Sequence, residues 1–538
     1  MIQPELIKSL RSYNTKTFFA DLSSGIIVGV VALPLAIAFA IASGVSPERG
    51  LFTAIIAGFI ISALGGSKVQ IGGPTGAFAV IVYNIVQQFG LSGLATATLM
   101  AGILLILLGV FKLGRLISFI PYTIITGFTA GIAVTIFTTQ VGDFFGLKTG
   151  AMPGDWFGKV LVYSKTFSTI DIYTTLVAII CLVIIFVWPH FNKKIPGSLV
   201  VIILSTVICL LLQKFAGLET VTIGSRYGQI PSTLPAPQLP AFSIQLVKQL
   251  APASISIAVL AAIESLLSAA VADGMIESKH DSNMELIAQG AANILSPLFG
   301  GIPATGAIAR TATNIKNGGR TPVAGIIHTL TLLLIMLFLG KYVVYIPMAA
   351  LAAVLVSVSW NMAGIPTIKA VMKGQKADTA VLFVTFLLTV FIDLTVAIEA
   401  GLLLAAFFFI QKTVKISAIK KCDSSSEQTA VYELSGPLFF GTIGKFESEI
   451  EKALQNARVL VLNMACTNYL DAGGAKALAQ LKTTCDKKNI ALYIAGICEQ
   501  PEKLLAKTGV INQIGKENIF ASVEAAVAKC NKEEKESI

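Results

Sequence analysis

The stretch GGPTGAFA at residues 72–79 has a near copy in the second half of the chain, GGIPATGAIA at residues 300–309. Both copies place two glycines and a proline before Thr-Gly-Ala, and the two threonines, Thr75 and Thr305, are separated by 230 positions. Glycine and proline disfavour a continuous helix, whereas the residues after each threonine can form one. Each copy therefore predicts a non-helical entry that leads into the first turn of a helix.

Composition places this repeat inside a membrane. The chain has 538 residues, of which 54% are hydrophobic and 13% charged, while soluble globular proteins carry about 25% charged residues. Apolar runs of about 20 residues, enough to cross a hydrocarbon core of ~30 Å as helices, recur between Ile26 and Ile410. We predict a polytopic α-helical membrane protein. Its polar N-terminal segment has no small-residue cleavage site, so we expect it to be retained.

The net charge of +10 reflects membrane orientation and does not indicate a nucleic-acid partner. If the chain has fourteen spans with both termini in the cytoplasm, the following basic residues all fall in cytoplasmic loops or flanks, as the positive-inside rule expects. These residues are Lys8, Arg11, Lys16, Lys112, Arg115, Lys193, Lys194, Lys369, Lys373, Lys376, Lys412, Lys415, Lys420 and Lys421. The pattern predicts a multi-pass protein of the cytoplasmic (inner) membrane.

The composition changes after Lys421, where a polar linker leads into a soluble α/β unit. Short β-rich runs (AVYELSG, RVLVLNMA) alternate there with amphipathic segments, a pattern typical of a small βαβ sheet. The unit has no phosphate-binding glycine loop, so we expect no ATP-driven motor, no enzyme activity and no cofactor. The expected divisions are an N-terminus at 1–22, a transport domain at 23–415 with repeats at about 23–216 and 250–412, a linker at 416–424, the soluble domain at 425–531 and a charged tail at 532–538.

The spacing of the repeat predicts an inverted architecture. An offset of 230 residues places seven spans in each half, and an odd number of spans turns the second copy upside down, as in many secondary transporters. Non-helical backbone at membrane depth must be buried or line a cavity. Two half-helix N-termini would then face each other, each with roughly +0.5 charge and free N–H groups that suit an anion. The alternative is that the glycines only permit close helix packing.

Several stretches together resemble the SulP (sulfate permease) family of anion transporters with its C-terminal STAS domain. They are the first span (DLSSGIIVGVVALPLAIAFAIASGVSPERGLFTA), GGPTGAFA, NGGRTPVAG and the C-terminal unit. The resemblance implies seven plus seven inverted spans, divided into a core and a gate domain, and a homodimer. It also implies secondary active anion transport by alternating access, coupled to H⁺ or Na⁺. Sulfate is the default substrate of that family, with bicarbonate and C4-dicarboxylates as alternatives.

The repeat and the resemblance together predict the substrate site. The expected substrate-binding residues are Phe39, Thr75, Gly76, Ala77, Phe78, Thr305, Gly306, Ala307, Ile308 and Arg310. The resemblance gives Arg310 the role of adding positive potential at the anion site, and the alternative is a salt bridge to Glu264. The chain also departs from its relatives. Leu35 follows Pro34 where Gln is common, and Ile308 stands where a sodium-coupled bicarbonate transporter has Thr.

Glu264 is the predicted coupling residue, with Ser268 one turn further along the same helix face. An acidic side chain within a span costs several kcal/mol and marks a functional site by default, although a structural ion pair is the alternative. A protonated Glu264 would suit H⁺ coupling. An ionised Glu264 with Ser268 and carbonyls of Gly306 and Ala307 would suit Na⁺. The sequence leaves both open.

Other polar residues receive lesser roles. Asp21 is expected to cap the start of the first span, and Asp393 and Glu399 to lie near a membrane interface. In the STAS-like unit, Asp471 is followed by Ala472 where bacterial anti-anti-sigma relatives carry a phosphorylated Ser, so the domain more plausibly supports assembly, trafficking or a cytosolic partner. No role is assigned to His190, His280 and His328.

Two further hypotheses differ in function. A nucleobase permease would share the seven-plus-seven fold but would have neither a STAS domain nor an arginine at the substrate. A non-transporting sensor would signal through the C-terminal domain. Seven cysteines without metal-ligand spacing predict structural thiols and no metal site.

Overall fold

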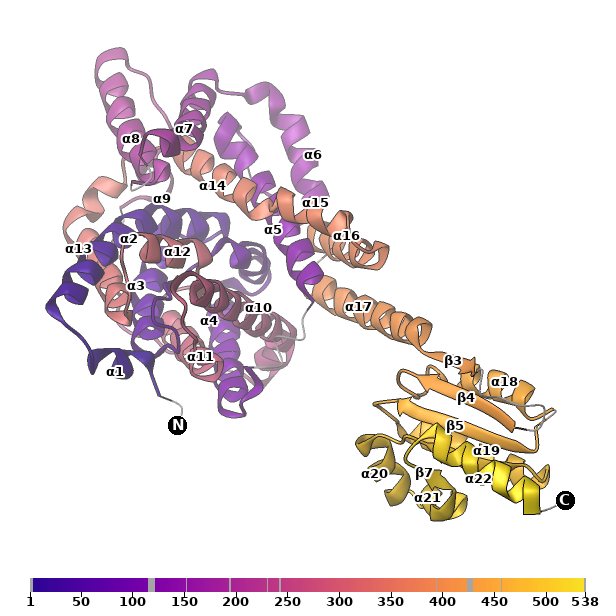
Figure 1. Cartoon of the computed structure of the whole chain (residues 1–538). Helices are drawn as coiled ribbons and strands as arrows, with labels where there is room; N and C mark the ends of the chain where they lie inside the picture. The colour runs from indigo at the N-terminus through magenta and orange to yellow at the C-terminus, as the bar shows by residue number, and fades with distance from the viewer. Residues whose placement is uncertain are drawn as a thin grey trace. The chain divides into compact units, whose positions relative to one another are not determined.

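The computed structural model describes residues 3–114, 121–150, 152–192, 195–229, 231–240, 243–392, 394–422, 429–455 and 457–536. The chain forms two compact units, Met1–Leu402 and Leu403–Ile538, which are treated separately (Figure 1). Some residues used above lie outside the described ranges: Arg115, Lys193, Lys194, Asp393, and residues 423 and 424 of the expected linker.

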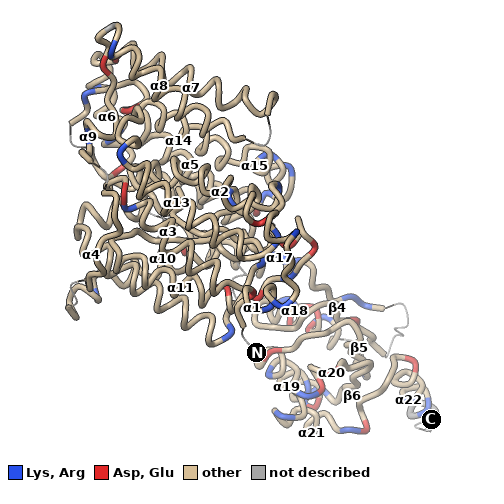
Figure 2. The backbone as a smooth tube through the Cα atoms, turned by 90° about the vertical axis from the view of Figure 1, so that its left-hand side faces the viewer, with Lys and Arg blue, Asp and Glu red and all other residues tan. Residues whose placement is uncertain are grey.

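Helices dominate the first unit. They are α1 (Glu5–Leu10), α2 (Thr15–Ala42), α3 (Pro47–Leu64), α4 (Ala79–Val110), α5 (Tyr122–Phe145), α6 (Trp156–Thr166), α7 (Ile172–Phe191), α8 (Gly197–Ala216), α9 (Ile223–Tyr227), α10 (Ile244–Ile276), α11 (Ser282–Leu298), α12 (Ile308–Lys316), α13 (Pro322–Val343), α14 (Met348–Ala363), α15 (Ile365–Met372) and α16 (Lys376–Phe391). The last apolar helix, α17 (Leu394–Ile416), begins in this unit and continues past its end at Leu402. Charged residues are sparse along the long helices (Figure 2).

The helices account for seven spans in each half. Within the described ranges, 10 helical segments are long and apolar enough to cross a membrane. One of them, α4, contains a break at Gly90, where φ is 66°, so it supplies two spans. The shorter helices α11, α12 and α16 complete the second half. The predicted fold of seven plus seven spans is thus confirmed.

The spans pack into two groups of helices. Helices α2, α3, α4, α10, α11 and α13 pack against one another, whereas α5, α7, α14 and α16 form a second group. Small residues allow close approach in the first group: a β-carbon added to Gly290 of α11 would lie 2.6 Å from the carbonyl oxygen of Gly102 of α4. Such contacts are typical of membrane helices. The two groups correspond to the expected core and gate domains.

The two copies of the repeated phrase meet in the middle of the first group. Strand β1 (Gly72–Gly73) pairs antiparallel with β2 (Thr305–Gly306), with Gly72 opposite Gly306 and Gly73 opposite Thr305. The backbone N–H of Ala307 also donates to Ile71 O at 2.9 Å. The non-helical segments thus satisfy part of each other's backbone hydrogen bonding, which membrane burial requires.

Polar side chains on one face of α11 make further hydrogen bonds to this buried backbone. Asn293 donates to Ala304 O at 2.8 Å and accepts from Ala304 N at 2.9 Å. Glu285 accepts from Gly66 N at 2.9 Å and from the side chain of Gln70 at 2.8 Å. These side chains are fully buried on α11. They hold the irregular segments that enter both half-helices.

The first span begins earlier than the sequence suggested. Helix α2 starts at Thr15, and its cap is Asn14, whose side chain accepts from the backbone N–H of Thr17. The prediction that Asp21 caps this span is wrong. Asp21 is buried and accepts from the backbone N–H of Arg320 at 2.8 Å and of Thr321 at 3.3 Å. It therefore stabilises the entry to α13, in the other repeat.

The second unit contains a five-stranded sheet in the order β3-β4-β5-β6-β7, antiparallel between β3 and β4 and otherwise parallel. Its strands are β3 (Ala418–Lys421), β4 (Thr429–Ser435), β5 (Val459–Cys466), β6 (Ala491–Ala495) and β7 (Ile519–Phe520), and its helices α18 (Ile443–Ala453), α19 (Ala472–Lys487), α20 (Glu499–Lys507), α21 (Val510–Ile514) and α22 (Val523–Glu536). Strand β3 lies within the expected linker, and α22 extends into the expected tail.

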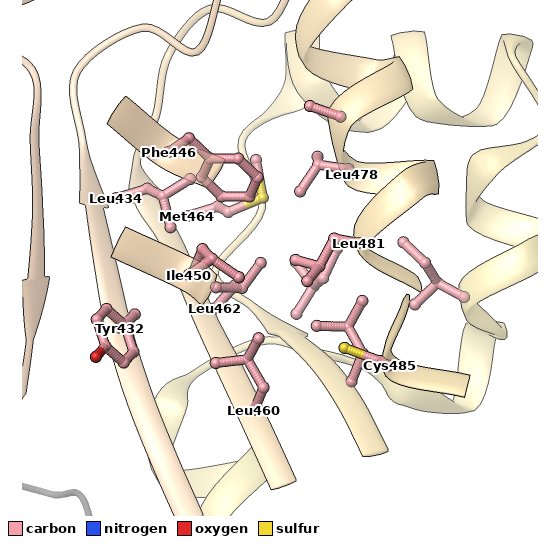
Figure 3. Close-up of a cluster of buried hydrophobic side chains, with 14 of the residues drawn as sticks. Tyr432, Leu434, Phe446, Ile450, Leu460, Leu462, Met464, Leu478, Leu481 and Cys485 are labelled. Carbon is pink, nitrogen blue, oxygen red and sulfur yellow. The ribbon is translucent and has the colours of Figure 1, made fainter. Parts of the chain in front are cut away.

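Alternation along the strands gives the sheet two apolar faces. Leu460 and Leu462 of β5 face α18 and α19, where they pack with Phe446 and Leu478 (Figure 3). Val461, between them, packs on the opposite face with residues of α22. Helices on both faces of a mostly parallel sheet are the expected arrangement for a small α/β domain.

Candidate functional site

A cavity of about 460 Å³ lies at the starts of the two half-helices. Most of the predicted site residues line it. They are Phe39, Thr75, Gly76, Ala77, Glu264, Gly306, Ala307, Ile308 and Arg310. Residues of α5 and α14 form the other side, so both helix groups contribute to the wall.

Neither half-helix start is capped by a side chain. Thr75 precedes a 3₁₀ turn at Gly76–Phe78 that leads into α4, and Ala307 precedes α12; neither makes a side-chain capping hydrogen bond. The first N–H groups of a helix have no partner within the helix and carry the positive end of its dipole. Because both starts line one cavity, they present donors and positive potential to the same small volume.

Glu264 of α10 is tied to the first half-helix. The hydroxyl of Thr75 donates to its Oε2 at 2.9 Å. The ion pairs formed among the described residues include neither Glu264 nor Arg310, so the alternative of a salt bridge between them is not what the structure shows. The cavity thus contains one carboxyl and one guanidinium that are not joined to each other.

Arg310 is held against the backbone of the first repeat copy. Its side chain is 3% exposed, and Nη2 donates to Pro74 O at 2.7 Å. A β-carbon on Gly73, where φ is 149°, would collide with Nη1. The guanidinium therefore packs beside two residues of the first copy, although it belongs to the second. In this position it adds positive potential to the cavity.

Three predicted residues lie beside the cavity wall and do not line it. Phe78 is fully buried, and the hydroxyl of Thr305 donates to Ala261 O at 2.9 Å. Ser268 donates to the hydroxyl of Thr311 at 3.3 Å and is 1% exposed. Of the residues considered for Na⁺, Glu264, Gly306 and Ala307 line the cavity, whereas Ser268 does not.

The sequence reading missed the gate side of the cavity. The polar residues there are Tyr122, Thr126, Thr129, Asn361 and Thr367. Thr126 and Thr129 donate to the carbonyls of Tyr122 and Ile125 at 2.9 Å and 2.7 Å. Polar residues within otherwise apolar spans were the sequence signal that could have identified this side of the cavity. Across the described ranges, no three His, Cys, Asp or Glu side chains gather as a metal site.

A helical bundle of inverted repeats, with a cavity between two uncapped half-helix starts, has the architecture of a secondary transporter. Comparison with known proteins specifies the class. The Sulfate permease family matches residues 18–385, and the STAS domain matches residues 424–526. The chain belongs to the sulfate permease family of anion transporters, and the resemblance inferred from the sequence is confirmed.

Relatives along nearly the whole chain differ in the substrate they are named for. YvdB of Bacillus subtilis, provisionally named a sulfate transporter, is 43% identical over 518 residues, covering 95% of this chain and 97% of the relative. The bicarbonate transporter BicA of Picosynechococcus is 30% identical over 537 residues, covering 94% of each chain.

Solved structures share the fold. Murine Slc26a9, an anion transporter solved in an inward-facing state, covers 99% of this chain and 94% of its own, with a TM-score of 0.88 at 20% identity. The transmembrane domain of a cyanobacterial BicA matches with a TM-score of 0.64 at 30% identity, over 75% of this chain and 100% of its own.

Proposed function

We propose that this protein is a secondary active transporter that moves a small oxyanion, sulfate by default, across the cytoplasmic membrane. The observation that carries the proposal is the cavity in which two uncapped half-helix starts and Arg310 meet. N–H donors and fixed positive potential in one small cavity favour a multiply charged oxyanion over a neutral solute. This electrostatic character also ranks a nucleobase substrate low.

We further propose that Glu264 couples transport to protons. Its carboxyl lines the anion cavity, and the Thr75 hydroxyl links it to the first half-helix. A protonated Glu264 leaves the cavity with the net positive charge of Arg310, whereas an ionised one cancels that charge. Binding of the proton therefore raises the affinity for the anion, and binding of the anion raises the affinity for the proton by the same factor. The burial of Ser268 against Thr311 supports a proton over Na⁺.

The proposed mechanism is alternating access. The cavity wall includes Phe39 and Glu264 from the first helix group and Thr126 and Met362 from the second. Movement of one group against the other would therefore open and close the cavity around the half-helix starts. We place both termini in the cytoplasm, expect a homodimer, and assign the STAS domain to assembly, trafficking or a cytosolic partner.

Bicarbonate is the second candidate substrate, since BicA transporters are relatives at 30% and 31% identity. Ile308 lines the cavity and offers no hydroxyl at the position where a sodium-coupled bicarbonate transporter has Thr. This difference supports sulfate over sodium-driven bicarbonate. A C4-dicarboxylate is a third candidate, because its size is also compatible with a cavity of about 460 Å³.

The deciding experiment is uptake into proteoliposomes that contain the purified full-length protein. Labelled sulfate, bicarbonate, fumarate and chloride are supplied in turn, under an imposed H⁺ gradient, an imposed Na⁺ gradient or neither. We expect sulfate to accumulate when the outside is acidic and to respond little to Na⁺. Uptake driven only by Na⁺ would refute the coupling assignment. A protein that moves none of the four anions, yet binds a partner when an anion is present, would be a sensor.

A further inference from the structure

His328 is an unexplained polar residue behind the proposed anion site. It lies on α13 and is fully buried, and in the described part of the chain neither ring nitrogen makes a well-formed hydrogen bond, although the backbone of Gly325, three residues earlier, interacts with the ring. A neutral imidazole has one donor and one acceptor nitrogen. Leaving such a group buried without a partner costs about 1–3 kcal/mol, and ordered water is the usual partner in such places.

The guanidinium of Arg310 also has one buried nitrogen without a hydrogen-bond partner. Nη1 is buried and has no partner among the described residues. It lies against Gly73, since a β-carbon there would collide with it. A β-carbon on Gly58 would lie 3.2 Å from Gly72 O and 3.8 Å from Cε1 of His328. The guanidinium thus contacts Gly73 of β1, while the imidazole ring and Gly72 share Gly58 as a neighbour.

A third buried polar group without a partner lies at the contact between α3 and α13. The hydroxyl of Ser62 on α3 is buried, 4% exposed as a residue, and has no partner within the described ranges. It would collide with a β-carbon on Gly325, which lies one turn before His328 on α13. Three buried polar groups near the α3–α13 contact and β1 therefore have no hydrogen-bond partner among the described residues.

We propose that ordered water bridges Nη1 of Arg310 to the ring of His328, which makes His328 a positioning residue for the anion site. Arginine can only donate hydrogen bonds, so the water accepts from Nη1 and donates to the unprotonated ring nitrogen. The guanidinium is then fixed on two sides, by Pro74 O at Nη2 and by the water at Nη1. The inference rests on the proposed function, because it assumes that the charge of Arg310 raises anion affinity.

The test measures half-saturation for labelled sulfate, and separately for bicarbonate, in proteoliposomes of the full chain. His328→Leu keeps an apolar side chain of similar size but removes the acceptor, and His328→Gln retains one. We expect His328→Leu to raise half-saturation about tenfold, the equivalent of one charge-assisted hydrogen bond, with a smaller change in maximal rate. His328→Gln should stay within about threefold of the unmodified protein, on the same basis.

A double-mutant cycle tests whether His328 acts through Arg310. In an Arg310→Ala background, His328→Leu should change half-saturation no further. Leu332→Ala is the matched control, because Leu332 lies one turn along the same helix and is equally buried. It should lower the melting temperature and leave half-saturation unchanged. An equal effect of His328→Leu in both backgrounds would overturn the positioning role.

The two proposals fail in different ways. If Arg310→Ala leaves anion affinity unchanged, Arg310 has no role at the site and the positioning role of His328 is rejected with it. If Arg310→Ala weakens binding while a folded His328→Leu protein does not, only the inference about His328 is wrong.

A spectroscopic measurement is independent of transport. The chain has 3 histidines, so solid-state NMR of the protein labelled with ¹⁵N-histidine gives few signals. The two ring-nitrogen signals that disappear in His328→Leu are those of His328. We expect that pair to show magnetisation transfer from water and to shift in Arg310→Ala. Ring nitrogens that show neither effect would exclude the water bridge.

Discussion

The contact between Gly73 and Arg310 explains why one residue without a side chain matters to the site. Gly73 has a φ of 149°, and a β-carbon there would collide with the guanidinium. We expect Gly73→Ala to displace Arg310 from Pro74 and to lower sulfate affinity at least tenfold, because a charged hydrogen bond worth about 1.5–3 kcal/mol is lost. Half-saturation in proteoliposomes measures this.

Gly274→Ala is the control for Gly73→Ala. Gly274 lies on α10, and a β-carbon there would meet no atom within 4 Å. Transport should therefore be unchanged. The melting temperature of the protein should be unchanged or slightly higher. Equal affinity in the Gly73→Ala protein and in the control would show that the position of Arg310 does not set affinity.

Glu264 carries the second prediction at this scale. Glu264→Gln keeps the shape and can still accept from Thr75, but it cannot release a proton. We expect uptake driven by a pH gradient to be lost, while exchange of labelled for unlabelled sulfate continues. Thr75→Ser, which retains the hydroxyl bonded to Glu264, should stay coupled. Gradient-driven uptake that persists in Glu264→Gln would reject Glu264 as the coupling residue.

The positions of residues at the cavity were predictable from the sequence where backbone chemistry determined them. The two Thr-Gly-Ala phrases indicated the half-helix starts, and both lie at the cavity. The orientation of single side chains was not accessible. Ser268 follows Glu264 by one turn yet bonds to Thr311, and Thr305 turns to Ala261 O. Contacts to neighbouring helices decide such orientations, and a periodic pattern on one helix does not contain them.

At the scale of elements, α11 is the helix whose importance the sequence did not reveal. It is short and carries Glu285, Gln289 and Asn293 on one buried face, so a search for apolar runs gives it little weight. Its polar face supplies hydrogen-bond partners to the backbone of segments that cannot be helical. The two repeat phrases predicted irregular backbone, but they did not show which helix would hold it.

This role of α11 can be tested with Asn293→Leu. The change leaves both the N–H and the C=O of Ala304 without their side-chain partner. Two unpaired buried groups cost about 2–6 kcal/mol in sum, so we expect a large fall in the melting temperature of the detergent-solubilised protein. Asn293→Asp, which keeps one acceptor for Ala304 N, should be less harmful. Equal melting temperatures for Asn293→Leu and the unmodified protein would contradict this role.

For the molecule as a whole, the division into a membrane unit and a soluble unit was predicted correctly in kind. Strand β3, however, forms from residues that the sequence assigned to the linker. A strand of four residues with two lysines, Ala418–Lys421, does not resemble a strand until its partner β4 is known. Pairing between neighbours, like side-chain orientation, is a property of the folded chain.

The soluble unit supports a prediction on pH. Cys485 lies in its apolar core, and burial raises the pKa of this thiol to about 11 from 9.0. The unfolded chain therefore loses this proton first, so stability is intact below pH 9 and falls as the pH rises toward 11. The slope is at most about 1.4 kcal/mol per pH unit. Urea titrations of the full chain, followed by a probe in the soluble unit, measure it.

Cys485→Ala should remove this slope, whatever it does to stability at pH 7. Cys466→Ala is the control, because Cys466 is exposed at the end of β5 and its loss should leave the slope in place. An identical pH dependence in the Cys485→Ala protein and the unmodified one would disprove the assignment.

The pairing of β1 with β2 also bears on how the protein is made. The two strands are more than 230 residues apart in sequence, so the first is synthesised and inserted long before its partner exists. Domains form during synthesis from the N-terminal side, and contacts distant in sequence close late. A nascent chain that ends before Thr305 can insert its early helices but has no second half-helix. The proposed anion site therefore forms only after the second half of the chain has been inserted.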